Sequence, residues 1–157
     1  MKNNPIRTLF ITRGSLYPPM AGAPLRNWQN IKLIMELGAV EVFSPDATPE
    51  DWNHSKESTP GIDLWSSPRV DQKLPLWKKI AYRLRQPGWL RIPGNLNVGK
   101  YYQYSISREL ERVLAEFQPQ FVIFEELWLY PCLRIVKRHQ CQTIFDNHNV
   151  ETILNRE

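Results

Sequence analysis

The sequence predicts an α/β fold, a doubly wound and mostly parallel sheet with helices on both of its faces. Short β-branched and aromatic segments alternate along the chain with amphipathic segments of helical period, and this alternation is typical of strand–helix–strand units. One segment, 121–124, is a continuous apolar run, as expected of a parallel strand that is buried on both faces. Crossover helices between such strands pack back onto the sheet.

The first half of the chain is predicted to be strand, loop, helix and strand. The first strand spans 6–12, and a loop with three prolines follows over 13–24. A helix then begins at Leu25. Its apolar face is formed by Leu25, Trp28, Ile31, Ile34 and Met35. Gly38 is expected to end this helix as a C-terminal glycine, before a short strand over 40–43.

The rest of the chain is predicted to contain three helices, two strands and one further short strand. Residues 46–73 have weak periodicity, so we expect loops there with one short strand near 62–65. The predicted helices span 76–85, 100–117 and 129–139, and the strands span 121–124 and 142–145.

Length and composition favour one globular domain. The chain has 157 residues, of which 42% are hydrophobic and 23% are charged, and these values are ordinary for a globular protein. Cys132 and Cys141 lack the spacing of a redox or zinc pair. The apolar run at the N-terminus is too short for a signal peptide or a membrane span. We therefore expect a cytoplasmic location, with a peripheral position at the inner face of the membrane as a further option.

Ligands of parallel α/β sheets bind where the carboxyl ends of the strands meet. Three loops are predicted there, over 13–26, 125–130 and 146–151. Glycines in the first loop would let backbone amides approach a phosphate near a helix N-terminus. Gly14 and Gly22 are eight residues apart, however, which fits neither a dinucleotide fingerprint nor a Walker loop. Gly22 could equally serve only to form a turn before the helix.

The second loop begins with two adjacent carboxylates, Glu125 and Glu126. Because they leave a buried strand side by side, they would repel each other and could titrate abnormally. The alternative is that one side chain points to solvent while the other caps the next helix.

The third loop contains a histidine between acidic residues. Asp146, His148 and Glu151 could supply a base or metal ligands. The simpler interpretation is that Asn147 or Asn149 caps a helix that begins at residue 150.

Two segments resemble glycosyltransferases of the GT-B fold, family 4. Residues 18–42, PPMAGAPLRNWQNIKLIMELGAVEV, are similar to the start of these enzymes, where a proline-rich loop with paired glycines precedes an arginine, a helix and a strand. The end of the chain, QTIFDNHNVETILNR, resembles the DxHNVE turn of a subset of that family. The order of the motifs matches over the whole chain. Ala23 stands where the second glycine of the pair is usual.

The resemblance implies the Rossmann-like, acceptor-side N-terminal half of a GT-B enzyme, with the nucleotide-sugar domain lying outside these 157 residues. It implies retaining transfer of a sugar from a nucleoside-diphosphate sugar to a glycan or lipid-linked acceptor, in cell-envelope or exopolysaccharide synthesis. No metal or cofactor is required. The 157 residues alone are expected to be inactive.

The resemblance also implies roles for individual residues. Catalytic roles fall to Glu126 and His148. The residues that would bind substrate are Gly22, Ala23, Arg26 and Asn149. Of these, the two small residues would approach the donor phosphates, and the arginine would begin the helix behind them.

Residues 69–100 are the most basic part of the chain, with eight basic residues and one acid in a protein of net charge +4. The side chains that would bind an anionic membrane surface are Lys78, Lys79, Arg83 and Arg85. The alternative is a solvated helix whose apolar side packs on the sheet. No motif that reads nucleic acid occurs, so no nucleic-acid partner is expected.

Two other functions remain open on the sequence alone. The chain could be a stand-alone Rossmann-like module that binds a polyanion or a membrane surface. It could also be a metal-dependent hydrolase that uses Asp146, His148 and Glu151.

Overall fold

The computed structural model describes residues 5–13, 22–48, 50, 53–54, 57, 61–62, 64–66, 77, 80–81, 84 and 104–146. Its strands and longer helices are β1 (Ile6–Ile11), α1 (Gly22–Met35), β2 (Gly38–Phe43), β3 (Leu64–Ser66), α5 (Tyr104–Phe117), β4 (Phe121–Phe124), α6 (Tyr130–Val136) and β5 (Gln142–Phe145). The strands form one five-stranded sheet in the order β3-β2-β1-β4-β5, and each of its four strand pairs is parallel. The predicted α/β class is confirmed.

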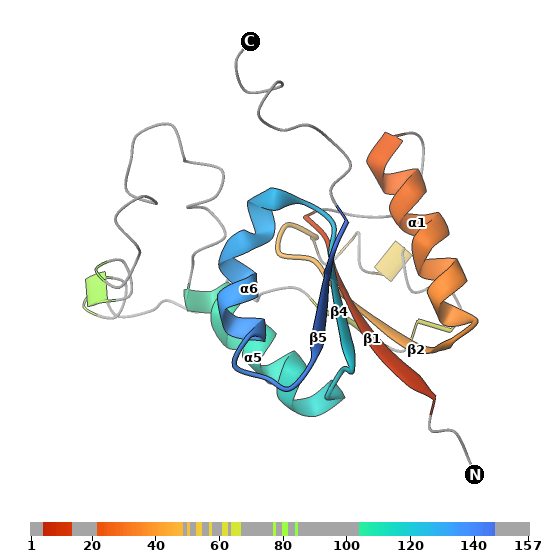
Figure 1. Cartoon of the computed structure of the whole chain (residues 1–157). Helices are drawn as coiled ribbons and strands as arrows, with labels where there is room; N and C mark the ends of the chain where they lie inside the picture. Colours follow the sequence, from red (N-terminus) through yellow and green to blue (C-terminus); the bar gives the residue numbers. More distant parts are fainter. Residues whose placement is uncertain are drawn as a thin grey trace.

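Helices cover the two faces of this sheet (Figure 1), with α1 on one side and α5 and α6 on the other. Successive side chains of a strand point to opposite faces, so the central strand β1 contributes to two cores. Phe10 packs with Trp28 and Ile31 of α1. Leu9 and Ile11 pack under α5 and α6. The central strands are apolar on both faces for this reason, as the run over 121–124 predicted.

Helix α1 begins three residues earlier than predicted, at Gly22 instead of Leu25. Pro24 lies in its first turn, where a missing backbone N–H costs nothing because that donor has no intrahelical partner. Leu25 is exposed instead of buried, so the buried face is narrower than the sequence suggested. Asn27, Trp28 and Ile31 form it.

Gly38 does not end α1, and the prediction of a C-terminal glycine is wrong. The helix ends at Met35, and Gly38 is the first residue of β2, where it pairs with Ile6 of β1. Its φ is not positive. A Cβ atom at Gly38 would lie 2.0 Å from the Ile6 carbonyl oxygen. Glycine is therefore required because two backbones approach closely, which also extends β2 two residues beyond its predicted start.

The region after β2 is more ordered than predicted. Glu50, Asn53, His54 and Glu57 are helical and exposed, whereas we expected loops there. Their helical face is polar, so it produced no apolar period. The short strand was predicted near 62–65 and is found as β3, over Leu64–Ser66. Of the helix predicted over 76–85, residues 77, 80, 81 and 84 are described, and all four are helical.

The C-terminal elements follow the prediction, with α6 shorter than expected and residues 100–103 of the preceding predicted helix outside the described residues. Four apolar side chains of α5 are buried at helical spacing: Ile106, Leu110, Val113 and Leu114. Helix α6 is preceded by a 3-10 turn, η2 (Leu127–Leu129), and ends at Val136. Strand β5 lies at the edge of the sheet, and its four residues are all exposed.

Candidate functional site

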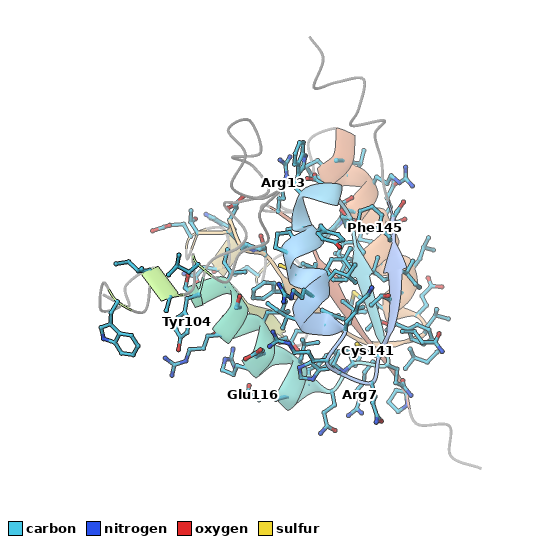
Figure 2. All side chains as sticks on the ribbon, turned by 60° about the vertical axis from the view of Figure 1, so that its left-hand side comes forward. Arg7, Arg13, Tyr104, Glu116, Cys141 and Phe145 are labelled. Atoms are coloured by element: carbon cyan, nitrogen blue, oxygen red, sulfur yellow. The ribbon has the colours of Figure 1, made fainter. Side chains whose placement is uncertain are left out.

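A polar cluster lies where the carboxyl ends of β1, β4 and β5 meet the first turns of α1. Figure 2 shows Arg13 and Phe145 toward this end of the sheet, and Arg7 and Cys141 toward the other. We call this group of polar side chains the carboxyl-edge cluster. Its members are Thr12, Arg13, Arg26, Asn27, Asn30, Glu125, Glu126 and Asp146. The predicted placement of the loops at one edge brings residues of all three loops together here.

Asp146 joins the end of β5 to α1. Arg26 donates from Nη2 to Asp146 Oδ1 at 2.9 Å, and Asn30 donates from Nδ2 to Asp146 Oδ2 at 3.1 Å. The backbone N–H of Asp146 also donates to the carbonyl of Phe124 at 2.7 Å. With both of its carboxylate oxygens accepting hydrogen bonds from one helix, Asp146 is fixed against α1 directly after the end of β5.

Glu126 forms an ion pair with Arg13, which follows β1. The Glu126 side chain is only 13% exposed. Helix α6 has Leu129 at its N-cap and no side-chain cap, so neither glutamate caps it. Glu125 is fully buried. The alternative of one solvated and one capping glutamate is therefore wrong, because both carboxyl groups turn into the cluster.

Glu125 lies under this network. Burial is the main cause that raises its pKa to about 9, and the charges of Asp146 and Glu126 raise it further, while Arg26 acts in the opposite direction. The carboxyl is therefore protonated at neutral pH and can donate a hydrogen bond. The expectation that the adjacent carboxylates titrate abnormally agrees with this shift, although burial contributes more than repulsion.

A buried amide lies beside the end of β1. Asn27 is 3% exposed, and its Nδ2 donates to Thr12 Oγ1 at 3.4 Å. Within the described part of the chain, its Oδ1 has no hydrogen-bond partner. Asn27 and Asn30 were not recognised in the sequence. The available signal was two asparagines, one directly after Arg26 and the other about one turn beyond it, on a helix that otherwise buries apolar side chains.

The predicted substrate-binding residues at the start of α1 lie beside this cluster. Gly22 has a φ of +61°, and a Cβ atom there would meet nothing within 4 Å. Ala23 is partly exposed. Arg26 does not begin the helix, as expected, but is its fifth residue. It was expected to lie behind a phosphate site, and it is bound to Asp146 instead.

Several predicted site residues lie outside the described residues. These are His148, Asn149, Lys78, Lys79, Arg83 and Arg85. The described residues of the basic segment include Trp77, Ile80 and Leu84, which are 66, 50 and 66% exposed. Their exposure contradicts the alternative in which the apolar side of this helix packs on the sheet.

Three further findings concern metals, thiols and membranes. Within the described residues, no group of three or more His, Cys, Asp or Glu side chains is placed to hold a metal ion. Both cysteines are free, and burial raises the pKa of Cys132 to about 12, which makes it a poor nucleophile. None of the helices in the described ranges has the length and apolar character needed to cross a membrane.

Comparison of the chain with models of protein families, with curated protein sequences and with solved structures found no match. Function must therefore be inferred from the residues of this chain and from their contacts.

Proposed function

We propose that these residues form the acceptor-side domain of a retaining glycosyltransferase of the GT-B type, family 4-like. The sheet order and the helices on both faces are compatible with a doubly wound, Rossmann-like half of such an enzyme. The reaction moves a sugar from a nucleoside-diphosphate sugar to a glycan or lipid-linked acceptor in polysaccharide synthesis. A second domain holds most of the donor.

One observation carries this proposal. The resemblance rests on two segments, one at the start of α1 and one at the end of β5, and these segments touch each other through Arg26, Asn30 and Asp146. Arg26 and Asp146 are 120 residues apart in sequence. Two motifs that build one site must lie close together in the fold. Two segments that resembled the family only by chance would have no reason to be in contact.

The contacts suggest how the site would work. By binding both oxygens of Asp146, α1 holds the residue two positions before His148, which we propose as a catalytic residue with Glu126. Arg13 orients the Glu126 carboxylate through their ion pair. Open space surrounds the position that a Cβ atom would take at Gly22, at the start of α1, where backbone N–H groups favour an anion. The donor phosphates would approach there.

The proposal is tested with the full-length gene product, incubated with a panel of UDP- and GDP-linked sugars and with glycan acceptors. We expect release of nucleoside diphosphate and transfer with retention at the anomeric carbon, which NMR of the product reports. Glu126→Gln and His148→Ala should each lower the rate at least about tenfold. Glu116→Gln, on the exposed surface of α5, is the matched control and should keep the rate.

Two results would contradict the proposal. One is the absence of donor turnover from a folded product that contains a second nucleotide-binding domain. The other is full activity in the Glu126 and His148 variants. The thermal midpoint of each variant must be measured alongside, because Glu126→Gln also weakens the pair with Arg13 and could lower activity through stability.

A second candidate function is supported by the exposure of Trp77, Ile80 and Leu84. Their spacing places them on one helix face, within the basic segment that includes Lys78, Lys79, Arg83 and Arg85. Apolar and basic side chains together favour an anionic membrane surface. A metal-dependent hydrolase is not proposed, because both oxygens of Asp146 already accept hydrogen bonds from α1.

This candidate predicts that the chain sediments with vesicles that contain phosphatidylserine, and that high salt releases it. Lys78→Glu combined with Lys79→Glu should reduce the bound fraction at least about tenfold, since each cation near the surface contributes about 1 kcal/mol. Lys137→Glu, beyond the end of α6, serves as the control. Equal binding to neutral and anionic vesicles would refute an electrostatic role.

A further inference from the structure

The carboxyl-edge cluster contains arginines but no excess of positive charge. Arg13 pairs with Glu126, and Arg26 pairs with Asp146. A third carboxylate, Asp46, follows β2, and its backbone N–H donates to the carbonyl of Arg13 at 2.9 Å. Within the described cluster, each of the two guanidinium groups is therefore paired with one carboxylate. Glu125 is protonated at neutral pH and adds no charge.

The segments that follow these strands in the sequence carry few charges. Residues 14–21, GSLYPPMA, contain no charged side chain, and residues 127–130, LWLY, contain none either. Residues 147–151, NHNVE, add one histidine and one glutamate. The excess of basic residues in this chain is concentrated elsewhere, between 69 and 100.

This balance of positive and negative side chains favours one kind of ligand over another. A phosphate or another polyanion is favoured where arginine and lysine side chains are present in excess of carboxylates. A sugar hydroxyl both donates and accepts hydrogen bonds, so it suits guanidinium and carboxylate groups that lie side by side. The Arg13, Arg26 and Asp146 side chains are 42, 52 and 26% exposed, so a ligand can reach them without separating the ion pairs.

Asn27 supplies an independent observation at the same place. Its side chain is almost fully buried and donates to Thr12, and its Oδ1 accepts no hydrogen bond from the described residues. A buried acceptor without a donor is costly, and native proteins usually satisfy it. Because this oxygen is closed to solvent, an O–H donor reaches it only when the side chains around it move, and a phosphate oxygen does not satisfy it.

We propose that the carboxyl-edge cluster binds the neutral, hydroxyl-rich end of the acceptor, a sugar ring that carries neither phosphate nor carboxylate. The inference rests on the proposed function and narrows its acceptor. Arg26 and Asp146 would contact neighbouring hydroxyl groups of that ring as donor and acceptor. The open start of α1 at Gly22 remains the place for the donor phosphates.

Nuclear magnetic resonance of the isotope-labelled full chain tests this proposal. The probes are the methyl glycosides of glucose, galactose and mannose, with glucose 1-phosphate and inorganic pyrophosphate as the charged comparison. We expect at least one neutral glycoside to shift the side-chain N–H signals of Arg26, Asn27 and Asn30, with a Kd in the millimolar range that added salt leaves unchanged.

Variants locate the binding. Arg26→Gln and Asn30→Ala should each weaken glycoside binding at least about fivefold, and two variants are used in case one fails to fold. Arg112→Gln on α5, whose partners Glu109 and Glu116 lie on the same helix, is the matched control. It should leave the Kd unchanged.

The proposal is overturned if the phosphorylated probes shift these side-chain signals and the neutral glycosides do not, or if no glycoside shifts them at millimolar concentrations. In either case the transferase proposal stands or falls separately, since it is decided by donor turnover in the full-length product. A transferase that uses an anionic acceptor would give turnover together with the first of these outcomes.

Discussion

The amino ends and the carboxyl ends of the parallel strands are held together in different ways, and we call these two ends of the sheet the amino edge and the carboxyl edge. At the amino edge, β1 and β2 begin with their backbones in close approach at Gly38 and Ile6. Gln120 donates its backbone N–H to the carbonyl of Arg7 at 2.9 Å and accepts the N–H of Arg7 on its side-chain Oε1 at 3.1 Å. At the carboxyl edge, charged side chains from α1, β1, β4 and β5 meet instead.

This difference indicates that the amino edge serves mainly stability, whereas the carboxyl edge is the candidate for function. Backbone contacts at the amino edge set the register of the strands and leave little for chemistry. Buried carboxyl groups and half-exposed guanidinium groups at the carboxyl edge cost folding free energy, because desolvating them is unfavourable. Groups that are expensive to bury and lie next to the expected ligand position are candidates for function.

The largest expected effect is at the amino edge. Gly38→Ala would place a Cβ atom 2.0 Å from a backbone oxygen that cannot move without disrupting β1. We expect a loss of at least about 3 kcal/mol in the free energy of unfolding, measured by urea denaturation. Gly22→Ala at the carboxyl edge is the comparison. It has open space and should cost only about 1 kcal/mol, from its positive φ. Equal losses would remove the distinction between the two edges.

The next effect concerns Glu125 and pH. Its pKa is about 9 in the folded chain and 4.5 ordinarily, so between these values the folded state holds a proton that the unfolded chain releases. Its contribution to stability is fully present below about pH 4.5 and falls as the pH rises to about 9. Glu125→Gln should remove this decline and raise stability at pH 8 by about 1–3 kcal/mol. Parallel pH profiles of the wild type and the variant would count against a buried neutral carboxyl.

A smaller effect is expected for the link between α1 and β5. A double-mutant cycle with Arg26→Ala and Asp146→Ala should give a coupling free energy of about 1 kcal/mol, because the carboxylate is partly buried. The same cycle on Arg138 and Glu111, which are 62 and 47% exposed, should give less than about 0.5 kcal/mol. If the exposed pair couples as strongly as the pair at the cluster, burial does not set the strength of these contacts.

The smallest effect returns to the amino edge. Gln120→Ala removes the acceptor for the Arg7 N–H, which lies at an exposed position and can bind water instead. We expect a loss of about 0.5 kcal/mol, since the backbone hydrogen bonds of Gln120 remain. Donor turnover in the full-length product should not change. A loss of activity would show that the two edges are coupled.

Most of the fold was predictable because its signals are local. The apolar run of β4 and the stripe of α5 give strand and helix directly. The errors have specific causes. Gly38 appeared to be a helix terminator because the sequence does not show that β1 would lie against it. The helical residues between 50 and 57 were missed because their exposed face is polar.

Of the candidate site, the three loops were predictable from strand ends, but the partners of each side chain were not. Glu126 was expected to repel Glu125 or to cap a helix, and its partner Arg13 follows another strand. Asp146 was considered as one carboxylate of a metal site, and it binds α1. Such pairs depend on distances between segments far apart in the chain, which no local pattern contains.

The sequence by itself determined the alternation of strands and helices, the class of the fold and the edge at which polar loops gather, because these follow from periodicity and from the geometry of parallel strands. The tertiary structure alone decided which charges are paired, which carboxyl is buried and which glycine is required. Those properties depend on neighbours brought together by folding, as Arg26 and Asp146 are across 120 residues.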